Sequence, residues 1–67
     1  MTITCTNFDI KNNHQDVLDI LGADYDYSER STWNNTAVYH LKKSAATSKQ
    51  SALEDIASIA GFDILIK

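Results

Sequence analysis

The residues able to bind a metal ion through sulfur or imidazole are few and scattered. Cysteine occurs once, at Cys5, and histidine occurs twice, at His14 and His40. No two of these residues stand at the short spacing that zinc and other transition-metal sites use. A single cysteine also excludes an internal disulfide. We therefore expect Cys5 to fill the core as a small apolar side chain, and we expect no bound metal or cofactor.

His40 is the side chain to consider as a general base. Such a base needs a nucleophile and an orienting carboxylate inside a cleft, and a chain of 67 residues rarely encloses one. In one hairpin register Glu29 lies opposite His40. We interpret these two residues as an ordinary cross-strand pair and not as a catalytic dyad. The two glycines, Gly22 and Gly61, are isolated helix stops and form no phosphate-binding loop. The sequence predicts a protein that is not an enzyme.

Trp33 is the side chain best suited to bind another protein. It has only serine, threonine and asparagine around it, from Ser31 to Thr36. Such a tryptophan either folds back over a small core or is exposed to a partner, and Trp, Tyr and Arg dominate the hot spots of protein interfaces. On the second interpretation, the partner-binding residues around it are Arg30, Asn34, Asn35 and Tyr39.

An acidic run precedes this tryptophan and consists of Asp24, Asp26 and Glu29. Its ordinary role is a solvated sheet edge, but it could also imitate the phosphate spacing of a nucleic acid. Residues 1–29 hold one basic and six acidic residues, whereas residues 30–67 hold five basic and three acidic ones, so net charges of −5 and +2 sum to −3. With an isoelectric point near 5.0, the chain is a poor candidate for binding nucleic acid by phosphate neutralisation.

The C-terminal part predicts a helix followed by a strand. Thr47 with Gln50 has the form of a capping box, and Ser48 is an equally good N-cap. Gly61 ends the helix in the left-handed conformation, with Phe62 folding back on the last turn, and a short Asp-Ile-Leu-Ile strand follows. The apolar stripe of the helix comprises Leu53, Ile56, Ala57 and Ala60, widened by Ala52 and Ile59.

The N-terminal part predicts a strand followed by a short helix. Residues 2–8 alternate threonine with apolar residues, and the strand bulges or ends near Asn7. Asn12 or Asn13 offers the N-cap of the helix, and Gly22 supplies its stop. The apolar residues of this helix are Val17, Leu18, Ile20 and Leu21.

The middle of the chain predicts a β-hairpin, for which the sequence allows two registers. A two-residue turn at Asn34-Asn35 would place Tyr25 and Tyr27 on the face that contains His40. A loop with an odd number of residues would place both tyrosines on the face that contains Tyr39. A slip of one residue exchanges the two faces. We favour the odd loop, because it gathers the larger apolar set.

The resulting order predicts one α+β domain over residues 1–67, a ferredoxin-like split β-α-β-β-α-β sandwich. Its sheet is four-stranded and antiparallel, with two helices on one face, and its first and third strands are central. The edge at residues 24–30 is acidic and polar, as a protected edge should be. The edge at residues 63–67 is more apolar and could accept a strand. The alternative is a three-stranded α+β sheet with a long irregular loop at residues 23–36.

Small acidic domains without catalytic residues are a common form for phage or mobile-element inhibitors of host machinery, including anti-CRISPR proteins. By this analogy of size and composition, we expect a non-enzymatic protein-interaction module that inhibits a host protein or nucleoprotein complex by steric blocking or nucleic-acid mimicry. The alternative is a single-stranded nucleic-acid-binding ferredoxin-like domain. Its stacking platforms would be Tyr25, Tyr27, Trp33 or Tyr39.

A homodimer through strand 63–67 is compatible with either function. The first residues lack the basic start and apolar run of a secretory signal, and no stretch is long enough to span a membrane. We therefore expect a soluble, cytoplasmic protein without a membrane partner.

Overall fold

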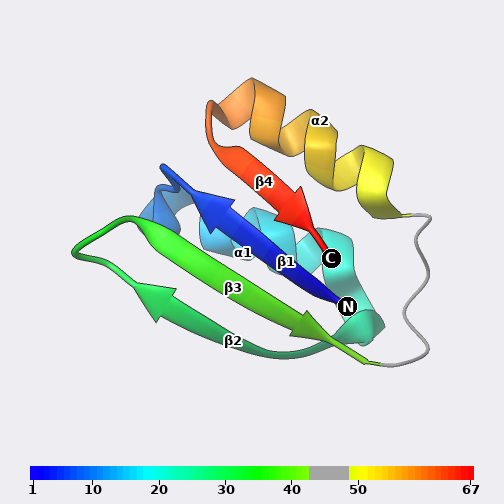
Figure 1. Cartoon of the computed structure of the whole chain (residues 1–67). Coiled ribbons are helices and arrows are strands. Elements are labelled where there is room, and N and C mark those ends of the chain that lie inside the picture. Colours follow the sequence, from blue (N-terminus) through cyan, green and yellow to red (C-terminus); the bar gives the residue numbers. More distant parts are fainter. Residues whose placement is uncertain (43–48) are drawn as a thin grey trace.

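The chain forms a four-stranded antiparallel sheet with two helices against one of its faces, as the computed structural model in Figure 1 shows. The structure describes residues 1–42 and 49–67. The elements are β1 (Thr2–Thr6), α1 (Ile10–Leu21), the 3₁₀ turn η1 (Gly22–Asp24), β2 (Tyr25–Ser31), β3 (Thr36–Leu41), α2 (Gln50–Ala60) and β4 (Asp63–Ile66). The strand order β2-β3-β1-β4 puts β1 and β3 in the centre and confirms the predicted α+β class and ferredoxin-like arrangement.

Alternate positions of the two central strands form the floor of the core. Ile3 and Cys5 on β1, with Ala37 and Tyr39 on β3, are at most 1% exposed. Pairing of β1 with β3 sets Ile3 opposite Tyr39, so these side chains share the helix-covered face. The remaining core residues are Phe8, Val17, Leu21, Leu53, Ala57 and Phe62. The predicted core role of Cys5 is confirmed, and burial raises the pKa of its thiol to about 12.

The first helix begins earlier than its asparagines suggested. Its N-cap is Asp9, whose Oδ1 accepts a hydrogen bond from the backbone N–H of Asn12 at 3.3 Å and whose Oδ2 accepts one from the Asn12 side chain at 2.6 Å. The prediction of an N-cap at Asn12 or Asn13 is therefore wrong. β1 ends at Thr6, and Asn7 has a φ of 53°, which confirms the predicted strand end.

Both helices end at a glycine, as predicted. Gly61 lies in the left-handed region at φ 82° and ψ 30°, and its N–H donates to the carbonyl of Ala57. Phe62 folds back as expected: its N–H donates to the same carbonyl, and its ring meets that of Phe8 edge-on at a centroid distance of 4.7 Å. Gly22 ends α1 at φ 53° and ψ −127°, a conformation that strains residues with a Cβ.

The second helix buries a narrower stripe than the sequence indicated. Leu53 and Ala57 are buried and Ile56 packs partly against the core. Ile59, by contrast, is 83% exposed, so the predicted widening of the stripe at that position is wrong. Ala52 and Ala60 are also exposed. The predicted capping residues at positions 47 and 48 lie outside the described residues.

The β2–β3 hairpin combines features of both predicted registers. Its loop has four residues, Thr32–Asn35, so the odd loop is wrong and Tyr27 pairs with His40 on the face away from the helices. An irregularity between Tyr25 and Tyr27 then shifts the pairing by one residue. Tyr25 therefore pairs with Leu41 and returns to the helix-covered face, where it packs against the core.

Candidate partner-binding surface

Trp33 projects from the loop between β2 and β3, and 88% of it is exposed. The interpretation in which it folds back over the core is therefore wrong. In Figure 1 this loop is the turn at one end of the green hairpin, and it connects β2 to β3. Large apolar side chains exposed at a projecting turn are typical of binding surfaces.

The loop that presents Trp33 is held by hydrogen bonds at its C-terminal side. The hydroxyl of Thr36 donates to the side-chain oxygen of Asn34 at 2.7 Å. Asn35 adopts a positive φ of 56°, which asparagine tolerates better than most residues. The carbonyl of Asn35 accepts a hydrogen bond from the backbone N–H of Phe8 at 2.9 Å. Because Phe8 is fully buried, this bond fastens the loop to the core.

A depression lies where this loop meets the connection between β1 and α1. One part, of about 270 Å³, is lined by Asn7, Phe8, Asp9 and Asn35. An adjoining part, of about 140 Å³, is lined by Asp9, Ile10, Lys11, Thr32 and Asn35. We call Thr32–Asn35 together with Asn7, Asp9, Ile10 and Lys11 the tip surface.

Sequence reasoning found one half of the tip surface and missed the other. Trp33, Asn34 and Asn35 were predicted, but the contributions of Thr32, Asn7, Asp9, Ile10 and Lys11 were not. A signal did exist, because Asn7 and Asn35 both have positive φ and asparagine is a residue type that allows it. What the sequence alone does not show is that these two turns lie side by side.

Two residues predicted to surround Trp33 lie elsewhere. Tyr39 is 0% exposed and belongs to the core, so its side chain offers no contact surface in this fold. Arg30 is exposed on β2. Burial is the main cause that lowers the pKa of His14 on α1, and the positive charge of Arg30 is the second cause. Because Arg30 pairs with the buried Ala37, its side chain lies on the helix-covered side of the sheet.

The acidic run does not form one continuous row. Asp24 lies in η1, where its carboxylate is 3.2 Å from the ammonium of Lys49. Asp26 is exposed at the irregularity of β2, and Glu29 is exposed on the open face of the sheet. Only Asp26 and Glu29 remain as exposed acids of this run, on either side of Tyr27.

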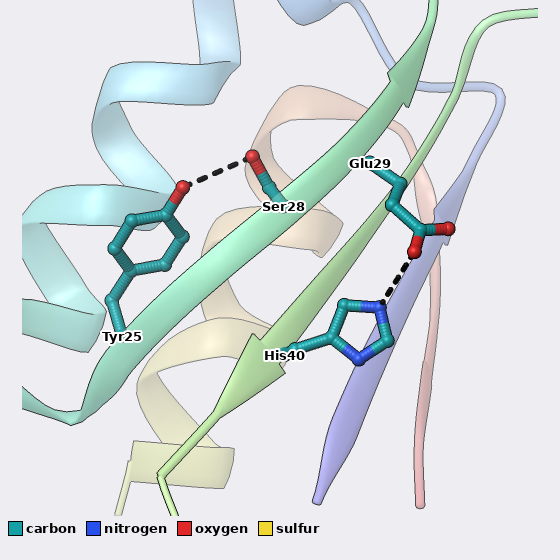
Figure 2. A network of polar contacts seen from close by, with 4 residues as sticks. All are labelled: Tyr25, Ser28, Glu29 and His40. Atoms are coloured by element: carbon teal, nitrogen blue, oxygen red, sulfur yellow. Dashed lines mark hydrogen bonds and ion pairs between the residues drawn. The ribbon is translucent and has the colours of Figure 1, made fainter.

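Figure 2 shows the polar contacts on the two faces of β2. On the open face, Oε1 of Glu29 is 3.4 Å from Nε2 of His40, close enough for an ion pair when the ring is protonated but not aligned as a hydrogen bond. The ring of Tyr27 stacks on that of His40 at 4.2 Å and 9°. On the other face, the hydroxyl of Tyr25 donates to that of Ser28 at 3.1 Å. The contacts on the open face join β2 to β3 and leave His40 stacked on Tyr27, whereas the Tyr25–Ser28 bond lies within β2.

Within residues 1–42 and 49–67, no group of three or more His, Cys, Asp or Glu side chains is placed to hold a metal ion. In the same part of the chain, no helix has the length and apolar character needed to cross a membrane. No protein-family model, curated protein or solved structure matches the chain.

Proposed function

We propose that the protein is a non-enzymatic interaction module that docks on another protein through the tip surface. The observation that carries this proposal is the 88% exposure of Trp33 on a loop fastened to the core. A buried tryptophan removes about 200 Å² from water, and at about 25 cal/mol per Å² this contributes about 5 kcal/mol before the costs of association. Because the loop is already held by its hydrogen bonds, little ordering is needed on binding.

The rest of the tip surface suits the rim of such an interface. Asn34 and Asn35 present amides next to Trp33, and Asp9 and Lys11 add one negative and one positive charge to the lining of the depression. An apolar anchor with polar and charged groups around it is the usual anatomy of a protein–protein interface. A partner that inserts a side chain into the depression would contact both turns at once.

In this proposal the module inhibits a host protein or nucleoprotein complex by steric blocking, as small phage and mobile-element inhibitors such as anti-CRISPR proteins do. This class rests on the size and acidity of the chain. Steric blocking is favoured over nucleic-acid mimicry, because Asp24 is paired with Lys49 and only Asp26 and Glu29 of the acidic run remain exposed. A mimic of a phosphate backbone needs a row of free charges with one orientation.

The alternative, a domain that stacks nucleic-acid bases on its open sheet face, draws less support from the geometry. Tyr39 is in the core and Tyr25 packs on the helix-covered face, so of the three tyrosines only Tyr27 has its ring on the open face of the strands. The open face of the central strand β1 carries Thr2 and Thr4. A base-stacking sheet usually places aromatic residues on such strands.

The proposal is tested with site-specific photo-crosslinking in cells that encode the protein. A photoreactive phenylalanine at Asn34 should yield a specific adduct with one partner, whereas the same group at Ile59, 83% exposed on α2, should not. With that partner purified, Trp33→Ala should weaken binding by at least about 2 kcal/mol, close to thirtyfold in Kd. Ile59→Ala is the matched control, because it removes an equally exposed apolar side chain elsewhere, and it should leave Kd unchanged.

Since Trp33 contacts solvent, Trp33→Ala should also change the free energy of unfolding by less than about 0.5 kcal/mol, so that lost binding cannot be ascribed to unfolding. Equal affinity of the Trp33→Ala and Ile59→Ala proteins would show that the tip surface is not the binding site. Retention of single-stranded oligonucleotides at low salt, lost as salt is raised, would instead favour the nucleic-acid alternative.

A further inference from the structure

The two edges of the sheet are protected to different degrees. The edge strand β2 is interrupted between Tyr25 and Tyr27 and exposes Asp26 and Arg30. Charges and irregular pairing of this kind discourage the addition of another strand. The opposite edge, β4, pairs with β1 without a register shift and carries an Ile-Leu-Ile centre. β4 is therefore the edge that is built to accept a strand.

The alternation of hydrogen bonds shows which backbone groups β4 has free. The N–H of Lys67 donates to the carbonyl of Thr2 at 2.9 Å. In an antiparallel ladder the bonded positions alternate, so the odd residues of β4 direct their N–H and C=O groups toward β1. The backbone groups of Ile64 and Ile66 therefore point away from the sheet.

We propose that β4 pairs antiparallel with β4 of a second copy of this chain, with Leu65 at the two-fold axis. This register sets Ile64 opposite the partner subunit's Ile66, so the outward backbone groups exchange hydrogen bonds. It also sets Asp63 opposite the partner subunit's Lys67, and Lys67 opposite the partner subunit's Asp63. Each end of the pairing then joins opposite charges.

Charge complementarity selects this register over its neighbours. If Ile64 paired with the partner subunit's Ile64, or Ile66 with the partner subunit's Ile66, the outward backbone groups would still be matched. In either case, however, Asp63 and Lys67 would no longer face each other. Opposite charges directly across an antiparallel pair stabilise it, and only the register centred on Leu65 brings both pairs together. The strand is thus complementary to itself.

The dimer also covers apolar surface that the monomer leaves exposed. Leu65 is 53% exposed on the open face, and at the two-fold axis it meets the partner subunit's Leu65. The axis is perpendicular to the sheet, so both copies of α2 lie on the same face of the combined sheet. Figure 1 shows α2 beside β4. Trp33 lies on the loop between β2 and β3, and the strand order separates this hairpin from β4 by β1.

Sedimentation equilibrium over a range of concentrations tests the proposal. The wild-type protein should dimerise, and Asp63→Lys and Lys67→Asp should each weaken the dimer by about tenfold, because each replaces two attractive pairs with two repulsive ones. The double variant, with both changes, should restore the wild-type Kd. Leu65→Lys, which places two ammonium groups at the axis, should abolish the dimer, whereas Trp33→Ala should leave it unchanged.

Amide hydrogen exchange provides a readout of the backbone itself. The amides of Ile64 and Ile66 should exchange quickly in dilute protein and become protected as its concentration rises. Leu65→Lys should remove that protection, and the far-ultraviolet circular dichroism of this variant shows whether the monomer is still folded. A wild-type protein that stays monomeric at millimolar concentration overturns the proposal. So does a dimer that the charge reversals and Leu65→Lys leave intact.

Discussion

The hydroxyl oxygen of Tyr39 lies 2.7 Å from Nδ1 of His14, and the two rings stack at 5.6 Å with an interplanar angle of 22°. This contact joins the centre of the sheet to α1. Burial raises the pKa of the fully covered Tyr39 far above its usual value, so its hydroxyl stays protonated and can donate to a neutral His14. A polar bond thus crosses the main packing interface of the protein.

The His14 contact predicts that stability falls in mild acid. Burial first, and the charge of Arg30 second, lower the pKa of His14 from 6.5. As pH falls, His14 therefore takes up a proton at a higher pH in the unfolded chain than in the folded chain. The stabilisation is complete above the pKa of His14 in the unfolded chain, and it is lost as pH falls through the pKa of His14 in the folded chain. Urea denaturation between about pH 7.5 and pH 5.5 should show a declining midpoint, in a range where few carboxylates titrate.

Substitution of each histidine separates this effect from other titrations. His14→Gln keeps an acceptor for the Tyr39 hydroxyl but cannot be protonated, so its midpoint should vary less with pH over the same range. His40→Gln is the control, and it should retain the decline that His14 causes. If His14→Gln shows the same pH dependence as the wild type, the assignment to His14 is wrong.

Removing the hydroxyl in Tyr39→Phe should cost about 1 kcal/mol of unfolding free energy, the usual net value of one such hydrogen bond. The ring contacts with Phe8 and Tyr25 remain in this variant. Tyr25→Phe is a matched control, since it removes a longer bond, of 3.1 Å to Ser28, at a less buried site. Urea midpoints should rank wild type, Tyr25→Phe and Tyr39→Phe in decreasing order. The reverse order of the two variants would show that the His14 contact is not important for stability.

The glycine after α2 should be needed for its backbone conformation alone. A Cβ at Gly61 would meet nothing within 4 Å, but φ is +82°. Gly61→Ala should therefore destabilise the fold by about 1 kcal/mol, the cost of the left-handed region for a residue with a Cβ. Gly61→Asn should cost less, because asparagine tolerates that region better. A Gly61→Ala protein as stable as the wild type in thermal denaturation would contradict this account.

Local signals in the sequence were sufficient to predict the order of the elements. Gly22 and Gly61 end the helices, and threonine alternating with Ile3 and Cys5 forms a half-buried strand. Each of these features depends on neighbours within a few residues, which is what periodicity and capping rules describe. The strand order followed from the topology that this sequence of elements usually adopts.

Features that depend on distant contacts were not predictable in the same way. The irregularity beside Tyr27 allows Tyr25 to reach the core, and alternation alone assigns both tyrosines to one face. Asp9 was missed as an N-cap because two asparagines nearby were equally suitable by type. The tip surface forms only when the turn at Asn7 meets the loop at Asn35, and their contact is set by the pairing of β1 with β3.

Lys49 links the start of α2 to the end of α1 and predicts a measurable coupling with Asp24. Its ammonium donates to the carbonyl of Leu21, the last residue of α1, and lies 3.2 Å from the Asp24 carboxylate. The two side chains are 33% and 24% exposed, so solvent screens the pair only partly.

Lys49→Met should cost more unfolding free energy than Asp24→Asn, because it also removes a positive charge from the negative end of α1. A double-mutant cycle should give a coupling of about 0.5 to 1 kcal/mol at low ionic strength, and this coupling should shrink as salt is raised. A coupling of zero at low salt would show that Lys49 acts on the helix end alone.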